Sequence, residues 1–259
     1  MRRFIITLGF FLNFIFPAHA FSVTHDFEVV LGVFDAARTR FTYELTPQTY
    51  RVGSEVSTNG FFDTLYPFKA VYATDGLIKP SGFLTQNYRY TSKSRFSKRS
   101  KELIYNDKGE PVYRLSSKDD TAKKVKIEES PNNAGTTDLQ TVMAKLSKQY
   151  NELKFCDSRM EVFDGKRRFS VIFKDEGSEE LPKHERSPYF GKAAKCSMYI
   201  DKLGAKGDDL LWELTSDRPV YFWIMEDPAT KIPFIARIQI EDTPLGRLDV
   251  YTGKIEIKG

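Results

Sequence analysis

The sequence predicts a mainly β protein with some α-helix (α+β): a strongly curved antiparallel sheet or open barrel, with one principal amphipathic helix packed on it. Three observations lead to this expectation. Apolar and polar residues alternate through most of the chain, turn signals recur roughly every 8–14 residues, and one segment has apolar residues at helical spacing. With 259 residues, 41% of them hydrophobic and 29% charged, the chain has the composition of a globular protein with a substantial core.

The N-terminal residues 1–20 have the three parts of a secretory signal peptide. A basic start is followed by an apolar run over 4–16 and by a small-residue site that ends at Ala20. The run of about 13 residues is shorter than the roughly 20 that cross a bilayer. An uncleaved membrane anchor is the alternative. We therefore expect cleavage after Ala20 and a periplasmic mature chain, residues 21–259, that forms a single β-rich domain.

The first half of the mature chain is predicted to be a succession of strands. Phe41, Tyr43 and Leu45 share one parity, while Thr42 and Glu44 share the other, which is the pattern of a half-buried strand. Pro, Gly and Asn separate this strand from similar runs. Strands are expected over 27–31, 41–45, 50–56, 68–78, 88–105 and 112–115, with turns at 35–38, 59–60, 79–82 and 106–109.

Residues 117–136 interrupt this alternation. They are polar and mix Lys with Asp and Glu, and Pro, Asn and Gly follow within the same segment. This composition predicts a linker or a long loop. The loop is also a possible seam between an N-terminal and a C-terminal half.

The principal helix is predicted over 137–152. Its apolar stripe recurs at positions i, i+3, i+4, i+7 and i+11, which places the stripe on one face of a helix. Thr137 with Gln140 three residues later forms a capping-box pattern, and Asp138 suits the positive end of the helix dipole. We expect this helix to pack on the sheet; a mobile lid or a partner-binding helix is the alternative. The stripe consists of Leu139, Val142, Met143, Leu146 and Tyr150.

Strands are expected again after the helix. Asp164-Gly165 predicts a hairpin turn of type I′ between strands near 156–162 and 169–173. The segment 220–225 is apolar on both faces, so it is either a central strand covered on both sides or the wall of a cavity. Alternation over 234–241 and 248–257, with a turn between them, ends the chain.

Several short motifs in this half occur in a fixed order. They are 137–146, Cys156, Val162–Phe169, Tyr189–Cys196, Arg218–Trp223 and Ile232-Pro233. With these motifs the chain resembles the bacterial envelope group called domain of unknown function 3108, whose members carry a signal peptide. The resemblance covers most of the mature chain and implies no catalytic residue. At the level of architecture alone, that family is similar to the curved open barrels of periplasmic lipoprotein carriers.

The two cysteines, Cys156 and Cys196, are in phase with apolar neighbours and can meet in the interior. In an oxidising compartment they are expected to form a disulfide that closes a loop of about 40 residues. Two buried free thiols are the alternative. A metal site is not expected, because these thiols and two distant histidines are too few ligands.

Charge gives little reason to expect a polyanion as partner. Removal of Arg2 and Arg3 with the signal peptide lowers the 39 basic residues to 37 against 35 acidic ones, a net charge of +2. Nucleic-acid binding is not expected, because the chain is exported. One basic run around Phe96 contains no acid, and contact with an anionic membrane surface or a solvated strand face both explain it. The run contains Lys93, Arg95, Lys98, Arg99 and Lys101.

The motifs of catalysis are absent from the sequence. There is no G-x-S-x-G motif or phosphate-binding loop, and neither His25 nor His184 lies in a nucleophile motif. Asp164 with the following basic residues fits an acid/base group with an anion clamp, but it fits a hairpin turn with a charged edge better. We expect no enzymatic activity and no cofactor.

The aromatic content of 14% suggests an apolar pocket closed by the helix, although the same residues can fill a core. We therefore expect a periplasmic, non-enzymatic protein that binds a hydrophobic ligand such as a lipid, or an envelope partner, in envelope maintenance. One alternative is a structural or scaffold protein with a self-filled core that binds another envelope protein; another is a cell-envelope hydrolase. The candidate pocket residues are Leu139, Met143, Tyr221, Phe222 and Trp223.

Overall fold

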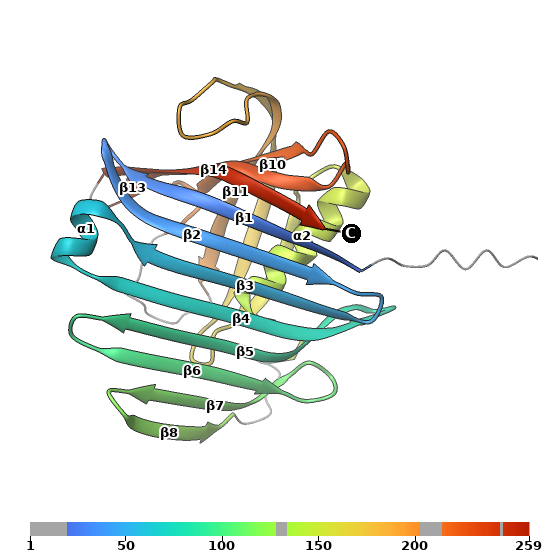
Figure 1. Cartoon of the computed structure of the whole chain (residues 1–259). Coiled ribbons are helices and arrows are strands. Elements are labelled where there is room, and N and C mark those ends of the chain that lie inside the picture. Colours follow the sequence, from blue (N-terminus) through green and yellow to red (C-terminus); the bar gives the residue numbers. More distant parts are fainter. Residues whose placement is uncertain (1–19, 128–133, 203–213, 244–245, 259) are drawn as a thin grey trace, which may run out of the picture.

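The computed structural model describes residues 20–127, 134–202, 214–243 and 246–258. In this part of the chain, 14 strands form one antiparallel sheet, accompanied by two helices (Figure 1). The predicted signal peptide lies outside the described residues, except for Ala20. The elements are β1 Phe21–Leu31, β2 Phe34–Leu45, β3 Thr49–Thr58, α1 Gly60–Leu65, β4 Phe68–Lys79, β5 Gly82–Ser94, β6 Lys98–Tyr105, β7 Pro111–Lys118, β8 Thr121–Lys126, α2 Leu139–Leu153, β9 Ser158–Phe163, β10 Arg168–Leu181, β11 Gly191–Lys202, β12 Val220–Glu226, β13 Pro233–Thr243 and β14 Gly246–Lys258.

The first and last strands pair with each other in the middle of the sheet. The strand order is β8-β7-β6-β5-β4-β3-β2-β1-β14-β13-β12-β11-β10-β9, so every neighbour except β1 and β14 is also consecutive in the chain. The two edge strands, β8 and β9, are consecutive in the chain but do not pair with each other. The segment between them contains α2. The sheet is therefore an open barrel, and the chain that joins its two edges supplies the helix inside it.

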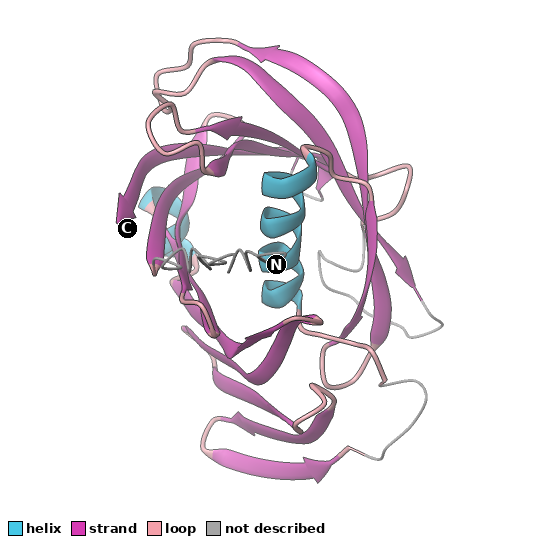
Figure 2. Cartoon of the chain, turned by 90° about the vertical axis from the view of Figure 1, so that its right-hand side faces the viewer, coloured by secondary structure: helices cyan, strands magenta, loops and turns pink. Residues whose placement is uncertain are grey.

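The sheet curls around α2 (Figure 2). The helix contacts β3, β4 and β5 from the first half and β9 and β13 from the second. Bulges bend several of the strands that curl, including those at Asp75/Gly76 and Trp223/Ile224. The predicted fold class, a curved antiparallel sheet or open barrel with one principal helix, is confirmed.

Helix α2 begins one residue later than the capping box predicts. Its N-cap is Asp138, whose carboxylate accepts hydrogen bonds from the backbone N–H groups of Gln140 and Thr141. Thr137 instead forms a parallel bridge with Val162 of β9. The capping-box prediction is wrong because Thr137 joins the edge of the sheet. The helix ends where Lys154 adopts a left-handed conformation, φ 58°.

The first predicted turn is also misplaced. Residues 35–38 belong to β2, and the turn begins three residues earlier, at Gly32 and Val33. Gly32 has φ 60°, which glycine adopts at little steric cost. The short helix α1, between β3 and β4, was not predicted.

The polar segment 117–136 is only partly the expected loop. Its first two residues end β7 and residues 121–126 form β8. Asp119 and Asp120 turn the chain with φ 47° and 68°, which is the pair of positive angles of a type I′ turn. Residues 128–133 lie outside the described part. Strands on both sides of the predicted seam belong to the same sheet.

Candidate functional site

A buried polar network ties the start of α2 to the N-terminal half of the sheet. Thr74 of β4 donates to Asp138 at 2.8 Å, and Thr85 of β5 donates to the other carboxylate oxygen at 3.2 Å. Tyr50 of β3 lies 2.8 Å from the Thr141 hydroxyl. The network spans 91 positions of sequence between Tyr50 and Thr141, so it fixes a contact that local structure does not determine.

The Asp138 carboxylate is 2% exposed and fully occupied. One oxygen accepts from Thr74 and from two backbone N–H groups, and the other accepts from Thr85 and from the Thr141 hydroxyl at 2.6 Å. Five hydrogen bonds leave no lone pair for a substrate or an attacking water. Asp138 therefore anchors the helix and does not have the geometry of a general base.

A second contact between the two halves holds the β9–β10 turn. Lys101 of β6 donates to the carbonyl of Asp164 at 3.0 Å, and Arg114 of β7 donates to the carbonyl of Gly165 at 2.6 Å. Burial lowers the pKa of the Lys101 ammonium group. Burial by itself would raise the pKa of Asp164, but the Arg167 backbone N–H and the Lys101 charge hold it below its usual value.

The predicted hairpin turn at Asp164-Gly165 is present, but not as type I′. Gly165 has φ 90°, whereas Lys166 is not among the residues with positive φ, so only one central residue is left-handed. The Asp164 carboxylate accepts from the backbone N–H groups of Lys166 and Arg167 and pairs with the Arg167 guanidinium at 2.7 Å. These contacts support the hairpin interpretation of the segment rather than a catalytic one.

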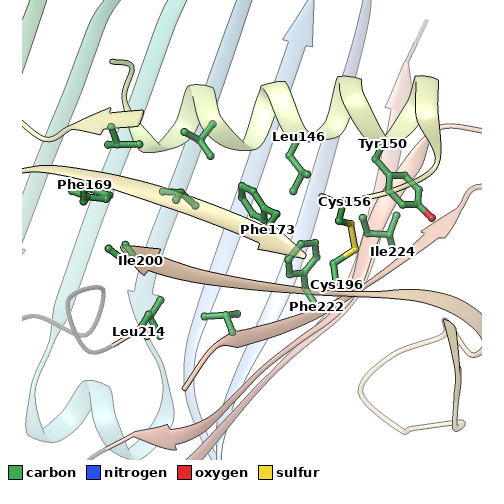
Figure 3. Packing of buried hydrophobic residues seen from close by; sticks show 14 residues of the cluster. Leu146, Tyr150, Cys156, Phe169, Phe173, Cys196, Ile200, Leu214, Phe222 and Ile224 are labelled. Carbon is green, nitrogen blue, oxygen red and sulfur yellow. A yellow bond between two sulfur atoms is a disulfide. The ribbon is translucent and has the colours of Figure 1, made fainter. Parts of the chain in front are cut away.

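The interior side of α2 is filled by side chains from β9 to β12 (Figure 3). Cys156 and Cys196 form a disulfide within this cluster, with a Cα–Cα distance of 6.2 Å, and both residues are fully buried. Val142 and Phe173 are at most 1% exposed. The predicted disulfide is present, and a disulfide is typical of proteins that fold in an oxidising, exported compartment.

The five predicted pocket residues do not share one space. Leu139 and Met143 pack against the cluster that contains Phe222, whereas Tyr221 and Trp223 belong to a second cluster with Leu181 and Phe234. Successive residues of a strand face opposite sides, so Phe222 and Trp223 of β12 cannot line the same cavity. The apolar character of β12 reflects cover on both faces, which was one of the two alternatives that the sequence left open.

On its second face, β12 is covered by charged side chains. Lys195 lies over the rings of Tyr221 and Trp223, at 4.9 and 5.3 Å, and Arg237 lies 5.5 Å from Trp223. Glu179 accepts a hydrogen bond from the Trp223 indole. Tyr221 also borders a pocket of about 240 Å³, half of whose eight lining residues are charged, which does not suit a purely apolar ligand.

The predicted basic run divides into two parts. Lys101 turns toward the β9–β10 turn, as described above. The other four, which we call the basic group, are exposed at the β5–β6 turn and make no ion pair within the described part of the chain. The basic group consists of Lys93, Arg95, Lys98 and Arg99.

The most conspicuous surface feature was not predicted. Six of the nine exposed large hydrophobic residues of the described chain lie in the β1–β2 turn, in and directly after α1, and in the β5–β6 turn. These elements lie at the same end of the sheet, on the left in Figure 1. We call this set the apolar rim. It consists of Val33, Phe34, Phe61, Leu65, Tyr66 and Phe96.

A sequence signal for the apolar rim existed. Phe34, Phe61 and Phe96 each stand in or next to a turn; Phe61 follows Gly60, Phe96 precedes Ser97, and Phe34 comes two residues after Gly32. An aromatic residue in such a position has no core face to occupy. Alternation of apolar and polar residues marks buried strand positions, so it gives no signal for these exposed aromatic residues.

Two further observations, on His25 and on metal ligands, concern the chemistry that the protein can perform. His25 is 7% exposed, and burial lowers its pKa from 6.5 to about 4, with a smaller opposite effect of Asp26. Its Nε2 atom has no hydrogen-bond partner in the described part. Among the described residues, no three His, Cys, Asp or Glu side chains are placed to hold a metal ion.

Comparison with known proteins gives a family and a structural relative. The sequence profile of the family described as "Protein of unknown function (DUF3108)" matches residues 26–248. No curated protein matches the chain. Among solved structures, the chain is similar to one titled "Crystal Structure of Beta-barrel-like Protein of Domain of Unknown Function DUF1849 from Brucella abortus". The identity is 10%, the TM-score is 0.49, and the alignment covers 93% of this chain and 98% of that one.

Proposed function

The chain belongs to the family of unknown function DUF3108, and from this premise we propose that it is an exported, non-catalytic binding protein that meets a partner of the cell envelope through its apolar rim. One observation carries the proposal: the exposed large hydrophobic residues concentrate at one end of an otherwise well-packed sheet. Contiguous exposed apolar side chains on a folded protein commonly mark a surface that binds something.

Export to the periplasm is supported by the disulfide together with the signal-peptide pattern of residues 1–20. Between Ala20 and the C-terminus, no helix in the described residues is long and apolar enough to cross a membrane.

The packing around α2 favours a self-filled core over a ligand-carrying pocket. A ligand beside α2 would have to displace buried side chains of the helix. Val142 and Leu146, for example, are at most 3% exposed and contact the C-terminal strands. On the other side of the helix, Ala144 packs with Tyr50 and Val52. The core is therefore filled by the protein itself, and the binding surface lies outside it. Native mass spectrometry of the periplasmic protein is expected to give the mass of the chain without lipid.

The proposal is tested by fractionating cells that produce the protein. The wild type is expected to sediment with the envelope, and the triple variant Phe34→Ser/Phe61→Ser/Phe96→Ser is expected to appear in the osmotic-shock fluid. The matched control is Leu153→Ser/Phe155→Ser, which removes exposed apolar residues near the end of α2. Equal distribution of the wild type and the rim variant would show that the rim binds no envelope component.

A further inference from the structure

The apolar rim is continuous across three elements. The rings of Phe34 and Phe61 lie 6.4 Å apart and join the β1–β2 turn to α1. The rings of Tyr66 and Phe96 lie 6.2 Å apart and join the end of α1 to the β5–β6 turn. At the two ends of this line, Val33 is 82% and Phe96 is 73% exposed. The rim therefore presents strongly exposed apolar side chains to the surroundings.

The basic group adjoins the same surface. Arg95 donates to the carbonyl of Thr64 in α1 at 3.1 Å, so its guanidinium lies beside the apolar rim. Lys93 and Lys98 are directly opposite each other on β5 and β6. Two like charges in that arrangement repel one another, and an external anion between them would relieve the repulsion.

The acidic residues near this end are mostly engaged elsewhere. Asp35 pairs with Arg186, and Asp63 accepts from Thr58. Asp119 accepts from the backbone N–H of Lys98 at 2.8 Å and offsets part of the local charge. Asp120 follows it in the β7–β8 turn. The balance at the β5–β6 turn remains positive, because four cations face two carboxylates.

We infer that the apolar rim and the basic group together bind the surface of a bilayer that contains anionic phospholipid, with the aromatic side chains inserted among the acyl chains and the cations against the headgroups. This inference rests on the proposed function and names its partner. Aromatic residues are favoured at the membrane–water interface, and each Lys or Arg near an anionic surface strengthens binding.

The shape of the surface favours a bilayer over a protein partner. A protein partner requires shape complementarity, with anchors that fill pockets. The apolar rim lies on two turns and a short helix, and none of the strands that these elements connect is an edge strand at which a partner could dock by strand addition. A bilayer accepts protruding apolar side chains of any arrangement, provided that they reach the same plane.

The inference is tested with the purified, disulfide-bonded mature chain and with extruded vesicles. One set of vesicles consists of phosphatidylcholine with about 30 mol% phosphatidylglycerol, which gives the bilayer an anionic surface. The other set consists of pure phosphatidylcholine. Sedimentation is expected to show binding to the anionic vesicles at least tenfold tighter than to the zwitterionic ones. Raising the salt from about 0.1 to 0.5 M should reduce that difference, because salt screens surface charges.

Two variants and two matched controls assign the binding to this surface. Lys93→Gln/Lys98→Gln is expected to weaken binding to anionic vesicles by about 30-fold, since two cations are lost. The control Lys79→Gln/Lys108→Gln removes the same charge from the β4–β5 and β6–β7 turns, at the other end of the sheet, and should change binding less than threefold. The triple rim variant should abolish binding to both kinds of vesicle, whereas Leu153→Ser/Phe155→Ser should not. Circular dichroism and thermal unfolding establish that each variant is folded.

Three results overturn the inference: no binding of the wild type to anionic vesicles, equal binding to both kinds of vesicle, or equal effects of the rim variants and their controls. The result for the proposed function is separate. The rim variant can be lost from the envelope fraction of cells while the purified wild type does not bind vesicles. In that case the rim binds a protein, and the bilayer is the wrong partner.

Discussion

The carboxylate of Asp138 and the hydroxyl of Thr74 lie 2.8 Å apart, although 64 positions of sequence separate them. This contact joins the cap of α2 to a strand on the opposite half of the open barrel. Backbone pairing joins the two halves of the described sheet through β1 and β14. Because β8 and β9 do not pair with each other, buried side-chain contacts of this kind connect the two halves on the other side of the open barrel.

Replacement of Asp138 should therefore destabilise the whole fold. Asp138→Ala removes the N-cap, which costs about 1 kcal/mol, and takes the carboxylate acceptor from three buried hydroxyls. Thr74 retains Gln140 as an acceptor, whereas Thr85 and Thr141 lose about 1 kcal/mol each. We expect a loss of about 3 kcal/mol in the free energy of unfolding, measured by urea titration. Asp138→Asn retains one acceptor oxygen and should lose less. The control Asp107→Ala, in the exposed β6–β7 turn, should change stability by less than about 0.5 kcal/mol; a similar loss in both variants would contradict the anchoring role.

The sequence was sufficient for the elements that depend on local pattern. Alternation placed most strands, helical spacing placed α2, and the shared phase of Cys156 and Cys196 placed both cysteines in the interior. It was insufficient where pairing between distant segments decides. Nothing in the alternation of β1 indicates that its neighbours are β2 and β14. Thr137 lies outside α2 because its backbone pairs with Val162 of the edge strand β9.

Part of the error in the predicted site was avoidable. Phe222 and Trp223 are adjacent in a strand, so period-two geometry already assigns them to opposite faces. By contrast, the filling of the space beside α2 depends on side chains from four other strands, which no local pattern reveals. The apolar rim was not predicted, although aromatic residues in turns were a sequence signal for it, one that concerns exposure rather than burial.

The β9–β10 turn provides a test of the contact between the two halves. A Cβ atom at Gly165 would lie 2.8 Å from a methyl group of Leu103 and 3.1 Å from Arg114, and φ there is 90°. Gly165→Ala should therefore lower the free energy of unfolding by about 2–3 kcal/mol, through backbone strain of about 1–2 kcal/mol together with the clash.

Gly177 is the matched control for this variant. Its φ of 84° is nearly the same, but a Cβ atom there would meet nothing within 4 Å. Gly177→Ala should lose only the strain component, about 1 kcal/mol. Urea titration of both variants separates the two causes, and equal losses would mean that the turn does not press against β6 and β7.

His25 should make stability depend on pH in the mildly acidic range. Its pKa is lowered to about 4 in the folded chain by burial, whereas the unfolded chain binds the proton near 6.5. Stability from this group is complete above pH 6.5 and declines as the pH falls from 6.5 toward 4, because protons then bind the unfolded state preferentially. The full effect amounts to about 3 kcal/mol.

The variant His25→Phe isolates that effect. The histidine ring lies among Phe27, Phe41 and Phe234, so an aromatic replacement retains the packing. Urea titrations at pH 7.5, 5.5 and 4.5 should show a smaller decline for the variant than for the wild type. Identical pH profiles would mean that His25 titrates normally in the folded protein, and an NMR titration of its ring protons gives the same answer directly.

The disulfide should contribute strongly to stability and resist chemical attack. Cys156 and Cys196 are 40 positions apart, and closing a loop of that length stabilises a chain by about 4 kcal/mol in the loop-entropy model. Cys156→Ser/Cys196→Ser should lower the free energy of unfolding by about that amount, or by more if the serine hydroxyls are left without partners in the apolar cluster. Cys156→Ala/Cys196→Ala removes the bond without adding hydroxyls and separates the two causes.

Because both residues are fully buried, an alkylating agent added with a mild reductant should modify neither sulfur until urea unfolds the chain. Rapid alkylation of the native, reduced protein, with no change in the urea midpoint, would show that the cluster around α2 does not depend on this bond.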